Sequence, residues 1–206
     1  MINIWMLLVL ILSYLIGSIN FSIIICRIKT GKDIRNFGSG NAGATNTLRT
    51  LGKGAGISVL ILDVLKTVAA ALISISIYKG DKSVAIYMSA IGTVLGHNYP
   101  VWFGFKGGKG IAVSAAAVFL ADWKIGLSIT AFSLLVMAVS KYVSLGSISG
   151  AALLIILALI FKRNDEMFIF FSIAIGILAI YRHKENIKRL LEGKENKLSL
   201  SKKKEN

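Results

Sequence analysis

Long apolar runs separated by short polar segments form the pattern of this chain. A helix needs about 20 apolar residues to cross a bilayer core of about 30 Å, and most of the runs approach that length. The pattern therefore predicts an all-α fold, a polytopic membrane helix bundle with seven transmembrane helices. The apolar runs fall at about residues 4–26, 56–78, 84–103, 111–121, 123–140, 145–161 and 166–181.

A cluster of two charges and a tryptophan, at residues 122–124, separates the fourth run from the fifth. A single helix over 111–140 would place both charges in hydrocarbon, which is energetically costly. Tryptophan and charged residues are common at a membrane interface. The cluster therefore predicts a turn between two shorter helices.

The distribution of charge predicts how the bundle is oriented. The 206 residues carry a net charge of +14, which by itself could indicate a nucleic-acid partner. With the N-terminus outside, however, most of the 24 lysines and arginines lie on the inner side, as the positive-inside rule requires. We therefore expect an outside N-terminus, a cytoplasmic C-terminus, a lipid bilayer around the helices and no nucleic-acid partner. The outer turns contain Lys79, Lys82, Lys124, Lys162 and Arg163.

The chain is expected to form one integral membrane domain over residues 1–206. Its first apolar run has no basic residue before it and no small-residue cleavage site after it, so we expect a permanent span rather than a signal peptide. A short basic tail, about 196–206, is expected to lie near anionic headgroups. Cys26 is the one cysteine, which excludes an internal disulfide and a cysteine metal cluster.

The first polar loop, residues 37–50, has the sequence "FGSGNAGATNTLRT". Gly38, Gly40 and Gly43 match the spacing of the dinucleotide fingerprint, but that fingerprint needs a preceding β-strand. The same glycines would let backbone N–H groups face a phosphate, with Arg49 as a bidentate donor. A tight re-entrant turn with Arg49 at the lipid headgroups explains the loop equally well. Further hydrogen-bonding side chains in this loop are those of Ser39, Asn41, Thr45, Asn46 and Thr47.

The second polar loop, residues 96–112, places two lysines around three glycines where the fourth apolar run begins. The first N–H groups of that helix would also face an anion. The glycine spacing and the residue after the second lysine do not match a P-loop, which disfavours a nucleotide hydrolase. Two lysines that extend to lipid headgroups are the simpler alternative. His97, at the inner end of the third run, is expected to make structural hydrogen bonds rather than to catalyse. The other residues of interest are Lys106, Gly107, Gly108, Lys109 and Gly110.

The third polar segment, residues 182–195, has the period of an amphipathic helix. Its apolar face, which we expect to dock on the inner end of the bundle, contains His183, Asn186, Ile187, Leu190 and Leu191. The opposite face, which we expect to be solvated, contains Lys184, Glu185, Lys188, Arg189 and Glu192. Ser144 lies in a further inner turn, 141–147.

Two charges lie inside the second apolar run. Asp63 and Lys66 are spaced i, i+3, so they can neutralise each other on one face of a helix. We expect a structural ion pair, with a proton relay as the functional alternative.

The three segments together resemble the PlsY family, the bacterial membrane glycerol-3-phosphate acyltransferases that use acyl phosphate as donor. The resemblance rests on "GSGNAGATNTLR" at 38–49, "GHNYPVWFGFKGGKG" at 96–110 and "HKENIKRLLEGKE" at 183–195, in this order along nearly the whole chain. One departure is Asn20, which gives "GSINF" where the family typically has "GSIPF". It could alter a kink in the first span.

The resemblance implies transfer of a fatty acyl group from acyl phosphate to the 1-hydroxyl of glycerol 3-phosphate, which gives lysophosphatidic acid and phosphate. It also implies a monomer in the bacterial inner membrane, a site that faces the cytoplasm, and no metal or other cofactor. The proton of the hydroxyl would go to His183 or to a substrate phosphate. The catalytic residues implied are Ser39, Arg49, His183 and Asn186, and the substrate-binding residues are Gly40, Asn41, Thr45, Asn46, His97, Lys106, Gly107, Gly108, Lys109, Gly110 and Ser144. Glu195 would support the fold.

The loops alone leave two other functions open. A transporter for phosphate or phosphoesters would bind the same anions without breaking a bond. A structural membrane protein would use its basic inner face only to gather anionic lipid.

Overall fold

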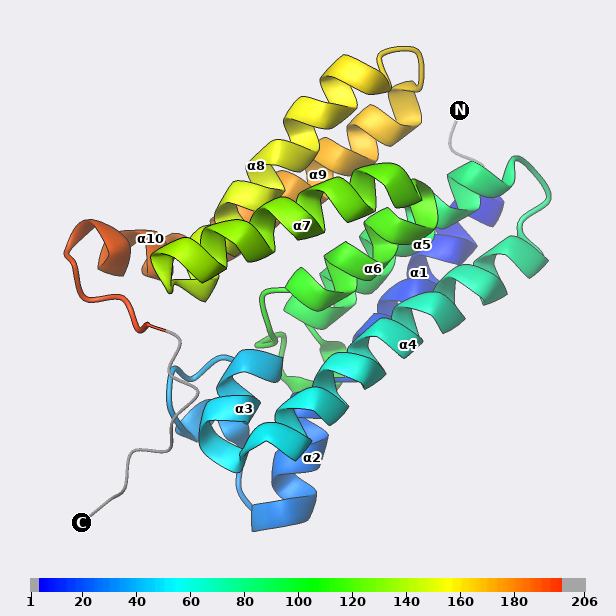
Figure 1. Ribbon diagram of the computed structural model, residues 1–206. Helices are drawn as coiled ribbons and strands as arrows, with labels where there is room; N and C mark the ends of the chain where they lie inside the picture. Colours follow the sequence, from blue (N-terminus) through cyan, green and yellow to red (C-terminus); the bar gives the residue numbers. More distant parts are fainter. Residues whose placement is uncertain (1–3, 198–206) are drawn as a thin grey trace, which may run out of the picture.

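The computed structural model describes residues 4–197, and within that range every regular element is helical, as predicted. The long helices run side by side, while α2, α3 and α10 lie at one end of the bundle (Figure 1). The elements are α1 (Ile4–Gly17), α2 (Phe21–Thr30), η1 (Ile34–Asn36), α3 (Ala44–Leu51), α4 (Lys53–Ile77), α5 (Lys82–Asn98), η2 (Val101–Phe103), α6 (Ile111–Ala121), α7 (Trp123–Ser140), α8 (Val143–Phe161), α9 (Glu166–Arg182) and α10 (Lys184–Leu191). Most of the predicted basic tail, residues 198–206, is outside the described range.

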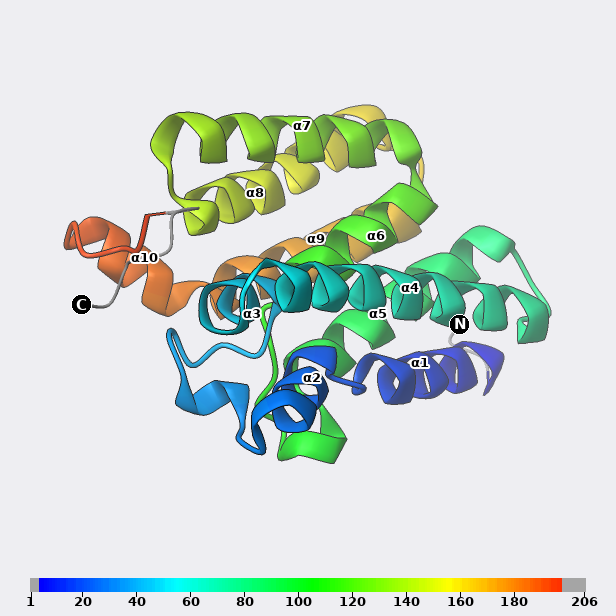
Figure 2. The same ribbon diagram turned by 60° about the horizontal axis from the view of Figure 1, so that its bottom comes forward.

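The helices form layers around α4, α6 and α9. Figure 2 shows α7 and α8 on one side of these helices and α1, α2 and α5 on the other. A core of aromatic and aliphatic side chains fills the space between α5, α8 and α9, with Tyr87 stacked on Phe171 at a centroid distance of 5.5 Å. On the far side, Gly92 and Gly96 of α5 let the backbone of α1 approach closely, as small residues do between membrane helices.

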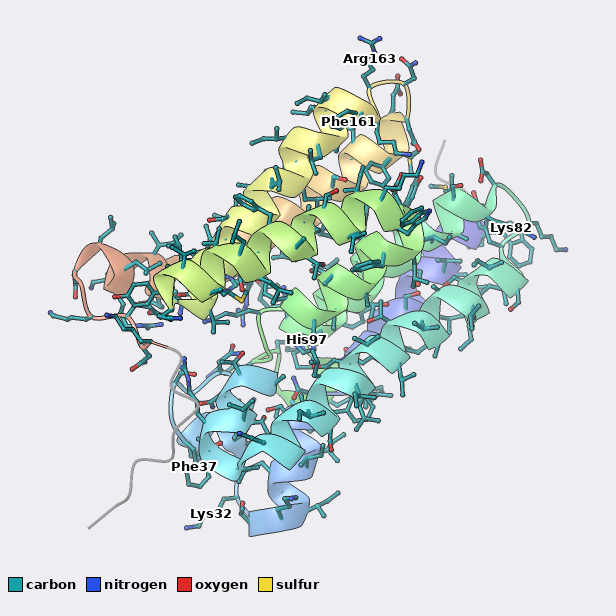
Figure 3. The ribbon with its side chains drawn as sticks, viewed as in Figure 1. Lys32, Phe37, Lys82, His97, Phe161 and Arg163 are labelled. Carbon is teal, nitrogen blue, oxygen red and sulfur yellow. The ribbon has the colours of Figure 1, made fainter. Side chains whose placement is uncertain are left out.

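Four segments between residues 4 and 197 are long and apolar enough to cross a membrane, namely α1 with α2, α4, α7 and α8. The bent pair α9 and α10 could add a fifth. Seven spans and an outside N-terminus therefore stay a prediction. The two ends of the bundle do separate the predicted inner and outer residues, since Lys32 and Phe37 lie at one end and Lys82 and Arg163 at the other (Figure 3).

Two predicted boundaries differ from the observed ones. The first apolar run is interrupted between Gly17 and Phe21, where Asn20 caps α2 by accepting the Ile23 N–H at 3.0 Å. The third run ends as a helix at Asn98, because Pro100 has no N–H to continue it. Both breaks lie at the end of the bundle that carries α3 and α10 (Figure 1).

Two predictions from charge are confirmed. Asp122 ends α6 and caps α7, where its carboxylate accepts N–H groups at 2.9 and 3.0 Å. Inside the bundle, Lys66 Nζ lies 2.8 Å from Asp63 Oδ1, with each side chain only 3% exposed. The expected ion pair is therefore present and buried.

Candidate active site

One cavity of about 450 Å³ brings the three polar segments together at the end of the bundle that carries α3 and α10. Its lining residues come from the loop before α3, the start of α6, the start of α8 and the junction of α9 with α10. Of the predicted site residues, it is lined by Ser39, Asn41, Thr45, Asn46, Arg49, His97, Lys109, Gly110, Ser144, His183 and Asn186. Gly40, Lys106, Gly107 and Gly108 are not among the lining residues.

The loop before α3 is held by the buried side chain of Asn46. Its Oδ1 accepts the Ser39 N–H and its Nδ2 donates to the Phe37 carbonyl, both at 3.0 Å. The amide therefore shapes the loop and sets the position of Ser39. Gly43 and the first turn of α3, with Thr45, line the cavity. The first N–H groups of a helix have no partner within it, and its dipole favours an anion there.

The glycines of the second loop differ from the expected phosphate cradle. Gly107 and Gly108 donate their N–H groups to the carbonyls of Asn98 and His97, both at 3.1 Å. A Cβ atom at either glycine would clash with His97. These glycines therefore allow close packing within the protein, and their N–H groups are already used.

The two lysines of this loop lie in different surroundings. Lys106 is exposed and is not among the cavity residues. Lys109 extends into the cavity and donates a hydrogen bond to Oδ1 of Asn186. Burial is the main reason that the pKa of Lys109 falls to about 8, and the positive charge of Arg189 lowers it further.

The carboxylate of Glu195 fixes the side chains around Lys109. It accepts hydrogen bonds from Ser144 Oγ at 2.8 Å, from Asn186 Nδ2 at 2.7 Å and from Arg189 Nε at 2.8 Å. Burial alone would raise the pKa of this carboxyl, but the three hydrogen bonds together lower it below its usual value. Because Asn186 donates to Glu195, its carbonyl oxygen is directed at Lys109.

His183 lies at the junction of α9 and α10, where the chain bends by 54°. Its Nδ1 is 2.7 Å from the Ala179 carbonyl oxygen. A carbonyl oxygen only accepts hydrogen bonds, so Nδ1 carries the proton. The other ring nitrogen, Nε2, is then an acceptor on a residue that lines the cavity.

The family Glycerol-3-phosphate acyltransferase matches residues 7–193 of this chain. The chain belongs to this family. A glycerol-3-phosphate acyltransferase of Shouchella clausii (strain KSM-K16) is 45% identical over 188 residues, which are 90% of this chain and 92% of the relative. One of Thermoanaerobacter sp. (strain X514) is 47% identical over 188 residues, 91% of this chain and 93% of the relative.

Solved structures agree with this assignment. A crystal structure of PlsY (YgiH), an integral membrane glycerol 3-phosphate acyltransferase in its glycerol 3-phosphate form, has a TM-score of 0.86 and 41% identity, covering 94% of this chain and 96% of that one. The lysophosphatidic acid form has a TM-score of 0.81 and 39% identity, covering 94% and 95%. The chain is thus an integral membrane acyltransferase by family.

Three arginines of this acyltransferase's site region have roles that the sequence analysis did not predict. Arg35 donates to the carbonyls of Phe103 and Lys106, and Arg182 donates to those of Gly107 and Gly108. These two arginines hold the second loop from both sides. Their partners are distant in sequence, so periodicity gives no indication of them.

The third, Arg189, lines the cavity and forms an ion pair at 2.8 Å with Glu195, the residue expected to support the fold. Arg189, predicted to lie on a solvated face, is only partly solvated: its side chain is 34% exposed and bends back to reach Glu195. Leu191, predicted to dock, is 85% exposed, which shows that the apolar face of α10 ends before it.

The pKa of Lys109 leads to a prediction about the pH dependence of the acyltransferase. In the free enzyme the ammonium of Lys109 loses its proton as the pH rises through about 8, and a neutral amine binds phosphate weakly. If Lys109 binds a substrate phosphate, as predicted, we expect kcat/KM to fall above that pH, while kcat holds to higher pH because the bound phosphate would stabilise the ammonium. Steady-state kinetics between pH 6 and 10 measure this. The Lys109→Met variant should lack this alkaline fall, and a fall that persists in the variant would contradict the assignment.

Removing the charge of Glu195 is expected to disorder the side chains around Lys109. Glu195→Gln replaces one carboxylate oxygen by an amide group that donates, although all three neighbours are donors. We expect kcat/KM to fall about tenfold, together with a lower melting temperature, since a charged hydrogen bond contributes about 1.5–3 kcal/mol. Glu192→Gln is the matched control, because the Glu192–Lys194 pair is largely exposed at 3.2 Å and such pairs contribute little. Equal effects of the two substitutions would contradict the prediction.

Proposed function

We propose that this acyltransferase takes its acyl group from acyl phosphate and transfers it to the 1-hydroxyl of glycerol 3-phosphate, giving lysophosphatidic acid and phosphate. The observation that carries the proposal is a single cavity with a cationic mouth and an apolar interior. One reactant is then a small phosphorylated polyol and the other a phosphate with a fatty tail. The two phosphates fit the cationic mouth of such a cavity, and the acyl tail fits its apolar interior.

The apolar part of the cavity supports a fatty acyl substrate. Its walls include Ile129, Met137 and Leu154, which line the same cavity as Arg49 and Lys109. Leu60 of α4 and Leu134 of α7 line it too, and they are 45% and 59% exposed. An acyl tail between these two helices would extend from the cavity into the surrounding lipid.

The polar part of the cavity supports the binding of two phosphates. Arg49 and Lys109 supply positive charge from different segments, and the N-termini of α3 and α6 face the same space. Ser39 and Thr45 add hydroxyl donors. We assign Lys106, Gly107 and Gly108 only an indirect role in substrate binding, through the position of Lys109.

In the proposed reaction, the 1-hydroxyl oxygen of glycerol 3-phosphate attacks the acyl carbonyl carbon. A carboxylic ester bond forms, the bond from that carbon to the bridging oxygen of the phosphate breaks, and phosphate leaves with the electron pair. The hydroxyl proton goes to Nε2 of His183 or to a substrate phosphate oxygen. The site would act mainly by holding the reactants together and stabilising negative charge.

We also propose that this site faces the cytoplasm of a bacterial cell and acts within one chain. The polar segments at the cavity end of the bundle carry most of the lysines and arginines, which the positive-inside rule places in the cytoplasm. One chain supplies Arg49, Lys109 and His183 to the cavity, so the proposed site needs no second copy to complete it. Labelling of Lys106→Cys in the Cys26→Ser background, in sealed vesicles, tests the orientation. We expect an impermeant reagent to label it only from the cytoplasmic side.

The decisive experiment varies the acyl donor for the purified protein in lipid nanodiscs with glycerol 3-phosphate. We expect lysophosphatidic acid from acyl phosphate and none from acyl-CoA or acyl carrier protein. If lysophosphatidic acid forms with acyl-CoA or acyl carrier protein but not with acyl phosphate, the choice of donor is overturned. Uptake of glycerol 3-phosphate into proteoliposomes without an acylated product would overturn the reaction and favour a transporter.

A further inference from the structure

The buried ion pair of α4 makes contacts that charge neutralisation does not require. Lys66 Nζ donates to the carbonyl oxygens of Gly17 at 3.2 Å and Ile19 at 2.8 Å, where α1 breaks before α2. Its third contact is Nδ1 of His97 at 3.0 Å. Carbonyl groups at a buried helix end need such donors, because they have no partner within the helix. Lys66 therefore joins the broken first span to the last turn of α5.

The contact with Lys66 bears on which nitrogen of His97 carries the proton. An ammonium group donates and does not accept, so a hydrogen bond from Lys66 Nζ to Nδ1 at 3.0 Å favours the form with the ring proton on Nε2. The competing form would donate from Nδ1 to Asp63 Oδ1, which is farther away at 3.6 Å. His97 lines the cavity, and a Cβ atom on Gly108 would clash with its Nε2. The same Cβ atom would lie 2.7 Å from the Ala42 carbonyl oxygen. Nε2 of His97 thus faces the place where the loop before α3 meets the loop before α6.

The first loop is tied to the same region from the other side. Asn20 donates from Nδ2 to the Ala42 carbonyl at 3.3 Å while its Oδ1 caps α2. The His97 carbonyl accepts the Gly108 N–H at 3.1 Å. The α1–α2 break, the end of α5 and both loops therefore meet around Lys66, and Asp63 balances its charge.

We propose that Lys66 is a positioning residue for acyl transfer, which holds His97 in its Nε2–H form so that the ring offers a hydrogen-bond donor to the bound glycerol 3-phosphate. His183 has the opposite tautomer, with Nε2 as the acceptor. The cavity would then have one imidazole donor and one imidazole acceptor, each fixed by a contact on its Nδ1. The kinetic part of this proposal rests on the proposed function, whereas the tautomer does not.

The tautomer can be measured directly by 15N NMR of histidine-labelled protein in nanodiscs, because the chain has only two histidines. In the His183→Gln variant, His97 is the one remaining histidine, so the spectrum shows its signal without overlap. We expect Nε2–H for His97 in the wild type, and a mixture of tautomers in Asp63→Asn/Lys66→Met. This double variant removes both charges, which avoids an unpaired buried charge. An Nδ1–H form in the wild type, donating to Asp63 Oδ1 at 3.6 Å, or an unchanged tautomer in the variant would overturn the proposal.

Kinetics then test whether Lys66 acts through His97. We expect Asp63→Asn/Lys66→Met to raise the KM for glycerol 3-phosphate about tenfold with a smaller change in kcat. In a His97→Phe background the same double substitution should raise KM no further. A further rise of similar size would overturn the proposal, because the pair would then act independently of His97.

The matched control is a second Asp–Lys pair. Asp122→Asn/Lys162→Met removes an ion pair of 2.7 Å at the turn between α6 and α7, and we expect wild-type KM. An equal KM increase in this control would also overturn the proposal, since the effect would then be one of general stability. If the wild-type protein forms no lysophosphatidic acid, the proposed function fails, and the NMR result still decides the tautomer.

Discussion

Replacing Lys109 with methionine is expected to lower kcat/KM for glycerol 3-phosphate by about 10²–10³-fold, the usual loss when a preorganised charge donor is removed from a closed site. Lys109 lines the cavity and donates to Asn186. Its ammonium has a lowered pKa because it is buried, so its charge acts in a medium of low dielectric constant, where it is strongest. Methionine keeps the length and apolar character of the side chain, which limits the loss of packing.

Lys106 provides a control of the same residue type in the same loop. Its side chain is exposed and outside the cavity, and its carbonyl oxygen, which accepts from Arg35 at 3.0 Å, is unchanged by substitution. We expect Lys106→Met to have a kcat/KM within about threefold of the wild type. Steady-state rates of lysophosphatidic acid formation measure both variants. A large loss for Lys106→Met with little loss for Lys109→Met would reverse the assignment.

The sequence was sufficient to predict those features of the fold that depend on the free-energy cost of burying a charge in a membrane. The turn at Asp122 follows from the cost of burying charge, and the pair Asp63–Lys66 follows from helical spacing. The convergence of three loops, which meet at one cavity, was predicted from the end of the bundle at which each apolar run was expected to stop. In each case a rule that uses only nearby residues is enough, because breaking it would cost a large free energy. Knowledge of distant contacts is therefore not needed.

Features decided by tertiary contacts could not be predicted in this way. A glycine-rich loop suits both anion binding and close packing, and Gly107 and Gly108 turned out to have the second role because His97 lies against them. The break at residues 18–20 depends on donors from Lys66, which is distant in sequence. Arg189 was assigned by helical period alone, which does not describe where a long flexible side chain ends.

The separation of roles within the cavity follows from these tertiary contacts. Three of the four catalytic candidates have a partner within the protein that fixes them: Glu195 holds Asn186, Ala179 holds His183, and Asn46 holds Ser39. Such partners restrict the side chains to one orientation before substrate binds, which reduces the entropy lost in reaching the transition state. Variants of the partners should therefore affect rates less than variants of the groups they hold.

His183→Gln is expected to lower kcat by about 10²–10⁴-fold, the range for loss of a general base. The hydrogen bond from Nδ1 to Ala179 at 2.7 Å leaves Nε2 as an acceptor in the cavity, so the ring can take the proton of the attacking hydroxyl. Glutamine retains a polar group of similar size but is a negligible base. We expect the KM for glycerol 3-phosphate to change little, since the phosphate contacts remain.

The result separates the two possible destinations of the hydroxyl proton. If a substrate phosphate oxygen takes the proton, His183→Gln should keep kcat within about threefold of wild type, because the ring would then only orient the hydroxyl. Lys184→Gln is the control, since Lys184 is the next residue and its side chain is exposed. A large loss of kcat in His183→Gln with none in Lys184→Gln assigns the proton to Nε2. The cavity would then combine a fixed base with positive charge at both phosphates, which is what attack on an acyl phosphate requires.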